Sequence, residues 1–472
     1  MSRNRVIYGV EGLFVGPPGS TGYHAINYLG SGIDDYSNAA LISGHNLLKQ
    51  IDRVQSLSYS INTDKQEITH LGKRGLIDRP IIISPTVELS FDYLINSVKN
   101  EARLGLNVNY SQFEGLLSGR AYETGGYLSL ISGLIARDIF YPTGDPYFPP
   151  NYRDKRNLFF VVGQEGQDLL KQSPNKEDFT TGTWYQGINS GNSGYHVISF
   201  GNSYLTSYRT AAAINSLPVA SVGFLAENVK WDSSGLSNIP GLYAENRTEI
   251  TDKRFYIPAI LDEGGPPVLL PGDITLDISA TGENKIVDLG VDFTGISIQN
   301  YDIGFSLQRE PLDSLGYKLP IDRQINFPVL VDFNFGVLVG DSQTGSLVGF
   351  INKNQEYNAK IKLKKPCYWG SGVVLTGAFN DGIQGYLHHT VIQYDLKRLK
   401  FNNVGYSNQI GNNTTANFSF STELDPDDLT KGWFISGLLN IEKVEDFILG
   451  EDGSYILDED GQPIVTNYIP LY

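Results

Sequence analysis

The chain has 472 residues, enough for two or three domains of ordinary size. Gly (51), Tyr (28) and Phe (23) are abundant and charged residues make up only 19%, a composition typical of short strands joined by tight turns. The net charge of −16 makes binding to a phosphate backbone unfavourable and argues against a groove that grips DNA or RNA.

The sequence starts with Met-Ser-Arg-Asn-Arg-Val and shows no apolar stretch of the secretory type. Its longest apolar runs, such as the one from Tyr127 to Ala136, are too short to cross a bilayer. We therefore expect a soluble protein that is made in the cytoplasm and does not insert into a membrane. Cys367 is the single cysteine, so an internal disulfide framework is excluded.

An internal repeat is the most informative feature. Residues 54–95 align without a gap with residues 298–339 at a constant offset of 244. The identical pairs are Gln55/Gln299, Leu71/Leu315, Gly72/Gly316, Ile77/Ile321, Asp78/Asp322, Arg79/Arg323, Ile81/Ile325, Val87/Val331, Phe91/Phe335 and Leu94/Leu338. This number of identities exceeds the chance level severalfold, so the chain is predicted to contain two copies of one unit.

Each copy is predicted to hold two long strands. Apolar residues alternate with polar ones from Leu57 to Ile61, and the phase is kept from Tyr301 to Phe305. The second strand runs from Val87 to Tyr93 and has its counterpart at Val331 to Val337. A slip of one residue would expose every apolar side chain, so each strand is expected to be half buried.

The two strands of the first copy are joined by an unusually long connection, from Thr63 to Arg79. Within it, Gly can supply a positive φ and Asp-Arg can pair charges. Two interpretations stay open: a packed turn with a local ion pair, or an arm that docks on a neighbouring subunit. The candidate arm residues of the two copies are Leu71, Gly72, Arg74, Asp78, Arg79, Leu315, Gly316, Asp322 and Arg323.

A weaker similarity follows at an offset of 194, where Val197-Ile198, Leu205 and Phe224 match Val391-Ile392, Leu399 and Phe418. The smaller offset implies extra residues in the first copy, placed in surface loops at 141–157 and 172–194, with one short helix around Glu165 to Gln172. The predicted domains are residues 1–236 for the first unit, 237–271 for a linker, 272–424 for the second unit and 425–472 for a C-terminal extension with small hairpins.

Residue constellations that carry catalysis or bind metals are missing from the sequence. None of its six histidines stands in a His-Glu-x-x-His or comparable spacing. The Gly-rich run from Gly16 to Gly22 lacks the Lys of a phosphate loop, and the acidic runs 425–428 and 457–460 lack the spacing of a calcium loop. The sequence therefore predicts a protein that is not an enzyme and that needs neither a metal nor a cofactor.

Several segments together resemble the phage tail tube (major tail) protein family. The paired strands at 51–61 and 87–93, with the long connection between them, resemble the inner strands of these proteins. The start of the chain, Val6 to Gly16, resembles that of many virion proteins, and the run from Tyr204 to Phe224 resembles the last strand pair of a tube unit. The resemblance covers about two thirds of the chain.

The resemblance implies an all-β fold with two tandem tube-type β-barrel or β-sandwich domains, each with a short helix, plus a small C-terminal β element. It also implies a virion protein whose three copies form a pseudo-sixfold ring, with the rings stacked into a tail tube that conducts DNA through an acidic channel. Candidate residues for the channel lining are Ser56, Ser58, Ser60, Glu88, Ser90, Asp92, Asp302, Asp332 and Asn334, although an ordinary solvated face would look the same.

The partners expected from the resemblance are further copies of the chain and other tail proteins such as the tape measure, baseplate or sheath, with DNA only in transient, non-adhesive passage. One alternative is a tail hub, baseplate or neck protein of the same fold with few copies per particle. Another is a receptor- or carbohydrate-binding tail protein, for which the many aromatic residues could form a sugar-stacking platform.

Overall fold

The computed structural model describes part of the chain in detail. The described residues are 10–16, 49–72, 74–81, 85–111, 130–131, 134, 155–163, 196–232, 269–280, 298–315, 320, 322–338, 356–368, 386–407, 415–426, 428, 430–438, 446–447 and 465–466. Over these residues the fold is all-β, as predicted: it contains one α-helix, one short 3-10 helix and many antiparallel strands. The helices within this part of the chain are too short to cross a membrane.

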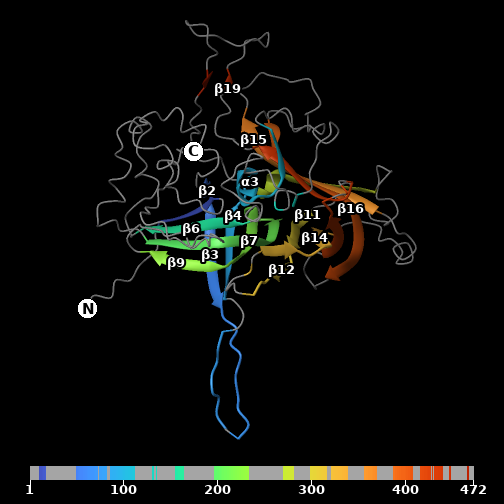
Figure 1. Cartoon of the computed structure of the whole chain (residues 1–472). Helices are drawn as coiled ribbons and strands as arrows, with labels where there is room; N and C mark the ends of the chain where they lie inside the picture. Colours follow the sequence, from blue (N-terminus) through green and yellow to red (C-terminus); the bar gives the residue numbers. More distant parts are fainter. Residues whose placement is uncertain are drawn as a thin grey trace, which may run out of the picture.

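The elements fall into two series along the chain (Figure 1). The first comprises β1 (Val10–Gly16), β2 (Lys49–Ile51), β3 (Val54–Asn62), β4 (Thr86–Leu94), α3 (Lys99–Leu104), β5 (Val108–Ser111), β6 (Arg156–Gly163), β7 (His196–Ala213), β8 (Val219–Ala226) and β9 (Asn228–Asp232). The second comprises η6 (Pro271–Asp273), β10 (Ile274–Ala280), β11 (Ile298–Ser306), β12 (Arg309–Leu312), β13 (Asp322–Ile325), β14 (Val329–Leu338), β15 (Glu356–Tyr368), β16 (Tyr386–Ser407), β17 (Thr415–Leu424) and β18 (Gly432–Leu438). Beyond them, β19 (Asp446–Phe447) pairs with β20 (Val465–Thr466), which is the small C-terminal β element.

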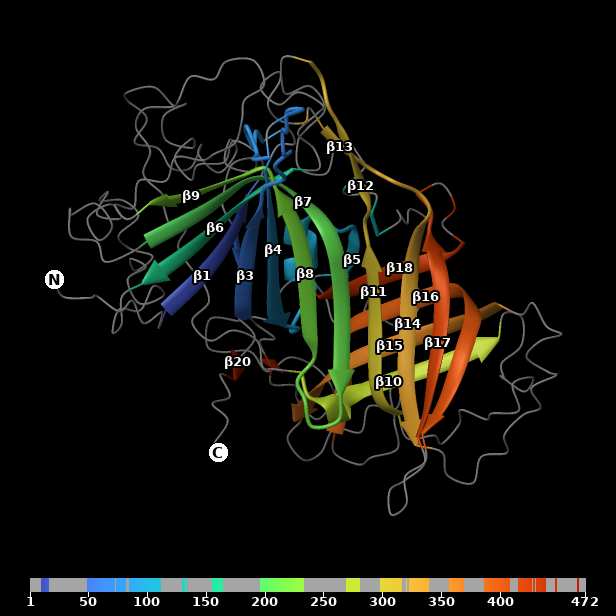
Figure 2. The ribbon, with the colours of Figure 1, turned by 90° about the horizontal axis from the view of Figure 1, so that it is seen from below.

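Eight strands lie side by side in one continuous antiparallel ladder, in the order β3-β4-β8-β7-β11-β14-β17-β16 (Figure 2). The sequence alternation explains its two faces, because successive side chains of a strand point to opposite sides. On β4 every second residue from Val87 to Tyr93 is buried, and on β14 the same holds from Val329 to Phe335. One face of the ladder is therefore apolar and covered, and the other is polar.

The first four strands of the ladder are equivalent to the last four in order and pairing. The strands behind the ladder also form equivalent pairs. The equivalent pairs are β1 and β10, β3 and β11, β4 and β14, β6 and β15, β7 and β16, β8 and β17, and β9 and β18. Core aromatics show the same geometry in both copies: Phe91 stacks on Phe224 at 6.1 Å and 10°, and Phe335 stacks on Phe420 at 5.9 Å and 9°. The tandem duplication thus extends to whole sheets.

The strand pairing corrects the offset of the second repeat segment from 194 to 196. Phe224 faces Leu89 of β4, and Phe420 faces Phe333, the residue equivalent to Leu89, of β14. Phe224 therefore corresponds to Phe420 and not to Phe418. A shift of two residues keeps each side chain on its face, so the sequence pattern alone did not separate the two registers.

The long strands β7 and β16 each serve two sheets. Their C-terminal halves belong to the ladder, and their N-terminal halves pair with β6 and β9, or with β15 and β18, in flanking sheets behind it. The change of sheet occurs at equivalent residues with left-handed backbone, Asn202 (φ 49°) and Arg398 (φ 51°). Because β18 lies beyond residue 424 and completes this arrangement, the second unit extends to Leu438, past the boundary expected from sequence.

Helix α3 covers the apolar face and carries a buried carboxylate. The hydroxyls of Tyr93 and Tyr208 each donate a hydrogen bond of 2.8 Å to Oε1 of Glu101, and all three side chains are buried. Burial raises the pKa of the Glu101 carboxyl, and the two hydrogen bonds offset part of that rise. The predicted helix around Glu165 to Gln172 lies outside the described residues, as does most of the predicted linker 237–271.

Candidate channel surface and subunit edges

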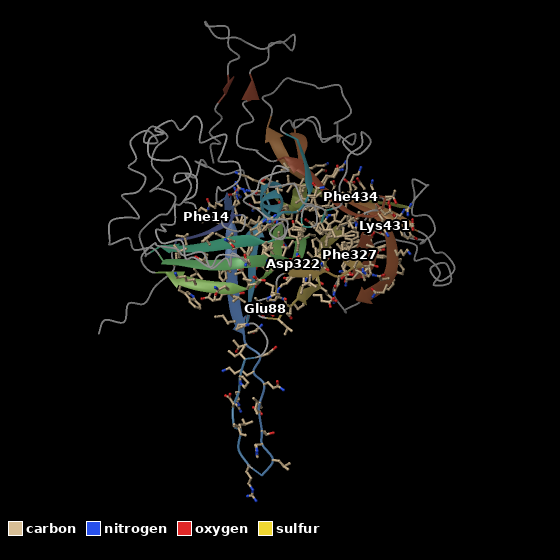
Figure 3. The ribbon with its side chains drawn as sticks, in the orientation of Figure 1. Phe14, Glu88, Asp322, Phe327, Lys431 and Phe434 are labelled. Atoms are coloured by element: carbon tan, nitrogen blue, oxygen red, sulfur yellow. The ribbon has the colours of Figure 1, made fainter. Side chains whose placement is uncertain are left out.

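The nine residues predicted to line a channel lie together on the polar face of the ladder. Register places Ser56 opposite Asp92, Ser58 opposite Ser90 and Ser60 opposite Glu88. In the second copy Asp302 faces Asn334, and Asp332 lies opposite Gly304. Glu88 lies on β4 near the point where the long connection leaves the body (Figure 3).

Hydrogen bonds between neighbouring strands fix part of this face. Ser56 Oγ donates to Oδ2 of Asp92 at 2.6 Å, and Ser221 Oγ of β8 donates to Oδ1 at 2.6 Å. The hydroxyls of Ser58 and Ser90 lie 2.7 Å apart. The Asp92 carboxylate is thus held between two strands with its charge toward the open side.

Arg209 of β7 is a member of this face that the sequence reasoning missed. Its Nε donates to Oδ1 of Asp302 at 2.7 Å, and a second nitrogen pairs with Oδ2. This pair raises the pKa of the Arg209 guanidinium above its usual value. Gly304 leaves room for the Arg209 side chain over β11, because a Cβ there would lie 3.1 Å from Cβ and Cγ of Arg209. A bulge between Leu205 and Ser207 shifts the alternation of β7, so pattern alone did not assign Arg209 to this face.

The polar face is hollow and carries an excess of negative charge. A concavity of about 870 Å³ lies over β4, β8, β7, β11 and β14 and includes Ser90, Asp92, Arg209, Asp302 and Asp332 in its lining. The ladder positions that face this side carry five carboxylates and two cations, a difference of three negative charges. These residues are Glu88, Asp92, Asp302, Asp332, Glu423, Arg209 and Lys400.

The junction between the two units is an uninterrupted strand pair. Strand β7 of the first unit pairs with β11 of the second from Ser207 opposite Ser306 to Ala213 opposite Asn300. The pairing continues beyond both ends, where the amide of Leu307 donates to the Thr206 carbonyl at 2.6 Å and that of Ile214 to the Gln299 carbonyl at 2.9 Å. Two units can therefore be joined side by side through backbone hydrogen bonds.

The two strands at the ends of the ladder are the equivalents of the junction strands β11 and β7, and the outer edge of each has no partner strand among the described residues. Among the described strands β3, the equivalent of β11, pairs only with β4, and residues 401–407 of β16, the equivalent of β7, pair only with β17. Apolar side chains that are covered at the junction are open at these edges. Ile303 and Phe305 are 0% and 5% exposed, whereas their equivalents Tyr59 and Ile61 are 36% and 46% exposed, and Tyr406 of β16 is 49% exposed.

The first connection is a long arm that projects away from the body beyond β3 and β4 (Figure 1). Two isolated bridges hold its strands together, and Gly72 near its tip has φ 92°, as the sequence predicted. The equivalent connection of the second copy, between β11 and β14, is called the second arm, and β12 and β13 pair at its base. Leu71 of the first arm and Leu315 of the second arm are almost fully exposed. Arg74 is also exposed, whereas Gly316 lies outside the described residues.

The recurrent Asp-Arg pair at the base of each arm has a local structural role. The backbone amide of Arg79 donates to Oδ1 of Asp78 at 2.8 Å, and that of Arg323 donates to Oδ1 of Asp322 at 2.9 Å. The guanidinium of Arg79 forms an ion pair with Glu67 at 2.7 Å rather than with its Asp neighbour.

No protein-family model matches the chain, and no curated protein matches it. Among solved structures it is similar to a chain of the anti-feeding prophage baseplate, with 8% identity and a TM-score of 0.19 over 35% of this chain and 93% of that one. It is also similar to an Hcp protein, with 12% identity and a TM-score of 0.18 over 35% of this chain and 98% of that one. Both TM-scores lie below 0.5, so the function is inferred below from the internal geometry of the chain.

Proposed function

We propose that the chain is a structural virion protein of a phage tail, in which three copies join head to tail into a ring and the rings stack into a tube. The observation that carries the proposal is the β7–β11 junction together with its two unpaired equivalents, β3 and the end of β16. A strand edge that stays open invites aggregation, and pairing it with an identical neighbour in a closed ring satisfies it. The resemblance to tail tube proteins, with six tube folds per ring, supports three chains per ring.

The internal junction also supplies the register for pairing between copies. The offsets of 244 and 196 convert the pair Ile303 and Thr210 into Tyr59 and Tyr406. They likewise convert Ser306 and Ser207 into Asn62 and Asn403. In this register the exposed apolar residues of one edge cover those of the other, as their equivalents do inside the chain.

The polar face would then line the channel of the tube. Its excess of carboxylates repels the phosphate backbone, so DNA passes without adhering. In this proposal the protein has no catalytic role and no cofactor. Its partners are further copies of itself and other tail proteins.

Electron microscopy of the purified protein tests the proposal. Two-dimensional class averages should show rings with threefold symmetry and six similar lobes around a central opening. A protein that remains monomeric at high concentration would contradict the ring. Rings with another number of chains would retain head-to-tail pairing but contradict the tube geometry.

A further inference from the structure

The base of the second arm is anchored on the first unit by a cluster of charged and polar groups. Arg309 Nε donates to the Leu205 carbonyl at 2.8 Å, and its guanidinium lies 5.1 Å from the centre of the Tyr204 ring. The Tyr204 hydroxyl donates to Oδ1 of Asp322 at 3.4 Å. Figure 3 labels Asp322 on the body of the molecule, away from the first arm. The second arm therefore rests on β7, next to the strand junction.

A buried carboxylate of the first unit completes this anchor. Arg323 of the second arm and Glu227, which follows β8, are both buried. Burial raises the pKa of Glu227, and the positive charges of Lys155 and Arg323 offset part of that rise. Asn202 also donates to Oε2 of Glu227 at 2.9 Å. The anchor thus brings a buried cation of the arm near a buried carboxylate of the unit that receives it, while Arg323 Nε and Oε1 of Glu227 make no hydrogen bond among the described residues.

Each residue of this anchor has an equivalent in the other copy of the repeat, and these equivalents lie on the first arm and on the second unit, where they do not meet within one chain. At the arm, Arg323 corresponds to Arg79 and Arg309 to Lys65, by the offset of 244. On the receiving strands, Glu227 corresponds to Glu423 by the offset of 196. Arg79 is more than half exposed and pairs with Glu67 of its own arm, and Glu423 pairs with Lys431 at 3.1 Å.

We infer that the base of the first arm sits on β16 and β17 of the next copy of this chain, as the base of the second arm sits on β7, with Arg79 near Glu423. The inference rests on the proposed head-to-tail ring and adds a second, charge-selective contact to the strand pairing. It gives the arm a role in choosing the partner edge, because a wrong register would separate the two charges.

Two substitutions distinguish the receiving edge from the internal anchor. Lys155, which lies 5.4 Å from the Tyr204 ring in the internal anchor, corresponds to Glu356 at the receiving edge. Tyr204 itself corresponds to Lys400, which lies opposite Glu356 in the strand register. The cation–π contact is lost there, and the incoming Lys65 would meet Glu356, which pairs with Arg398 of its own chain at 3.6 Å.

Charge reversal tests the contact. Arg79→Glu should raise the protein concentration needed for ring formation about tenfold, and Glu423→Arg in the same chain should restore assembly. Lys362→Glu, the same charge change on β15, outside the ladder and both arms, is the matched control and should assemble like the wild type. Circular dichroism of each variant verifies the fold of the monomer.

The outcomes separate this inference from the ring itself. If the wild type forms rings and Arg79→Glu forms them at the same concentration, the charged anchor is refuted and the ring stands. If Arg79→Glu is impaired but the double variant is not rescued, the partner is not Glu423. If the wild type forms no rings, the proposed function fails and the inference with it.

Discussion

Glu101 is a carboxylate held in an apolar interior by two tyrosine hydroxyls, and Oε2 has no hydrogen-bond partner among the described residues. Its pKa is raised by burial, so the folded state binds the proton more tightly than the unfolded chain. The stabilising effect of that proton is complete below the unfolded pKa of about 4.3 and is lost as pH rises through the folded pKa.

We therefore predict that the free energy of unfolding of the wild type falls over this range of pH and that Glu101→Gln, which does not ionise, lacks this part of the fall. Urea denaturation between about pH 4 and pH 8, at a concentration that gives monomer, measures both proteins. If the free energy of unfolding of the wild type and of Glu101→Gln changed in parallel with pH, the pH dependence could not be attributed to Glu101.

Trp433 joins the two units through its ring. It is fully buried, with ring centres at 5.6 Å from Tyr208 of the first unit and at 6.0 Å from Phe305 of the second. Trp433→Ala should lower the free energy of unfolding by about 3–5 kcal/mol, because it leaves a cavity between the units. Trp231→Ala is the matched control: this side chain is about half exposed and loses one hydrogen bond, to Tyr59, so its removal should cost only about 1 kcal/mol. Equal losses in denaturant titrations would show that Trp433 does not join the units.

At the scale of the element, substitutions in β3 should have little effect on the stability of the monomer and a large effect on ring formation. Ile61 is about half exposed, whereas its equivalent Phe305 is buried against the junction. Ile61→Lys is expected to alter monomer stability by less than about 0.5 kcal/mol and to abolish ring formation, since a charge would be buried at the edge.

Ile214→Lys gives the control for this edge variant, because Ile214 is equally exposed but lies in the turn after β7. It should form rings in sedimentation experiments, whereas Ile61→Lys should sediment as a monomer. Ring formation by both variants would exclude β3 as an assembly edge.

The elements also show what the sequence could and could not predict. Strict alternation made β4, β11 and β14 predictable, including their buried faces, because each pairs in a register that the pattern fixes. Strand β3 was predicted as a strand too, but the expectation that it is half buried was wrong, because β3 ends the ladder and Tyr59 and Ile61 stay exposed. The offset of the later strands was wrong by two residues, since their register is set by the partners β4 and β14 and not by local pattern. Arg209 was missed for a similar reason, because the bulge in β7 is a property of strand pairing. Strand β18 was assigned to an extension because its partner β16 is distant in sequence.

At the scale of the whole molecule, the two ends of the ladder are complementary, so the open question is whether head-to-tail assembly closes into a ring. A head-to-tail contact that copies the β7–β11 junction repeats one rotation, so it forms a closed ring or an open filament. In the proposed ring, the third copy pairs with the first, so no more than three copies can be linked in succession. Cross-linking across the predicted edge pair can count them.

In a chain with Cys367→Ser, the substitutions Asn62→Cys and Asn403→Cys place one thiol on each edge, opposite one another in the predicted register. A short thiol cross-linker should give dimers and trimers on a denaturing gel and nothing larger, with the trimer as the end point. Ser56→Cys combined with Asn403→Cys displaces one thiol by six residues, about 20 Å along the strand, and should not cross-link. A ladder that continues beyond the trimer would show an open filament or a larger ring, and equal cross-linking by both pairs would refute the register that the internal junction supplies.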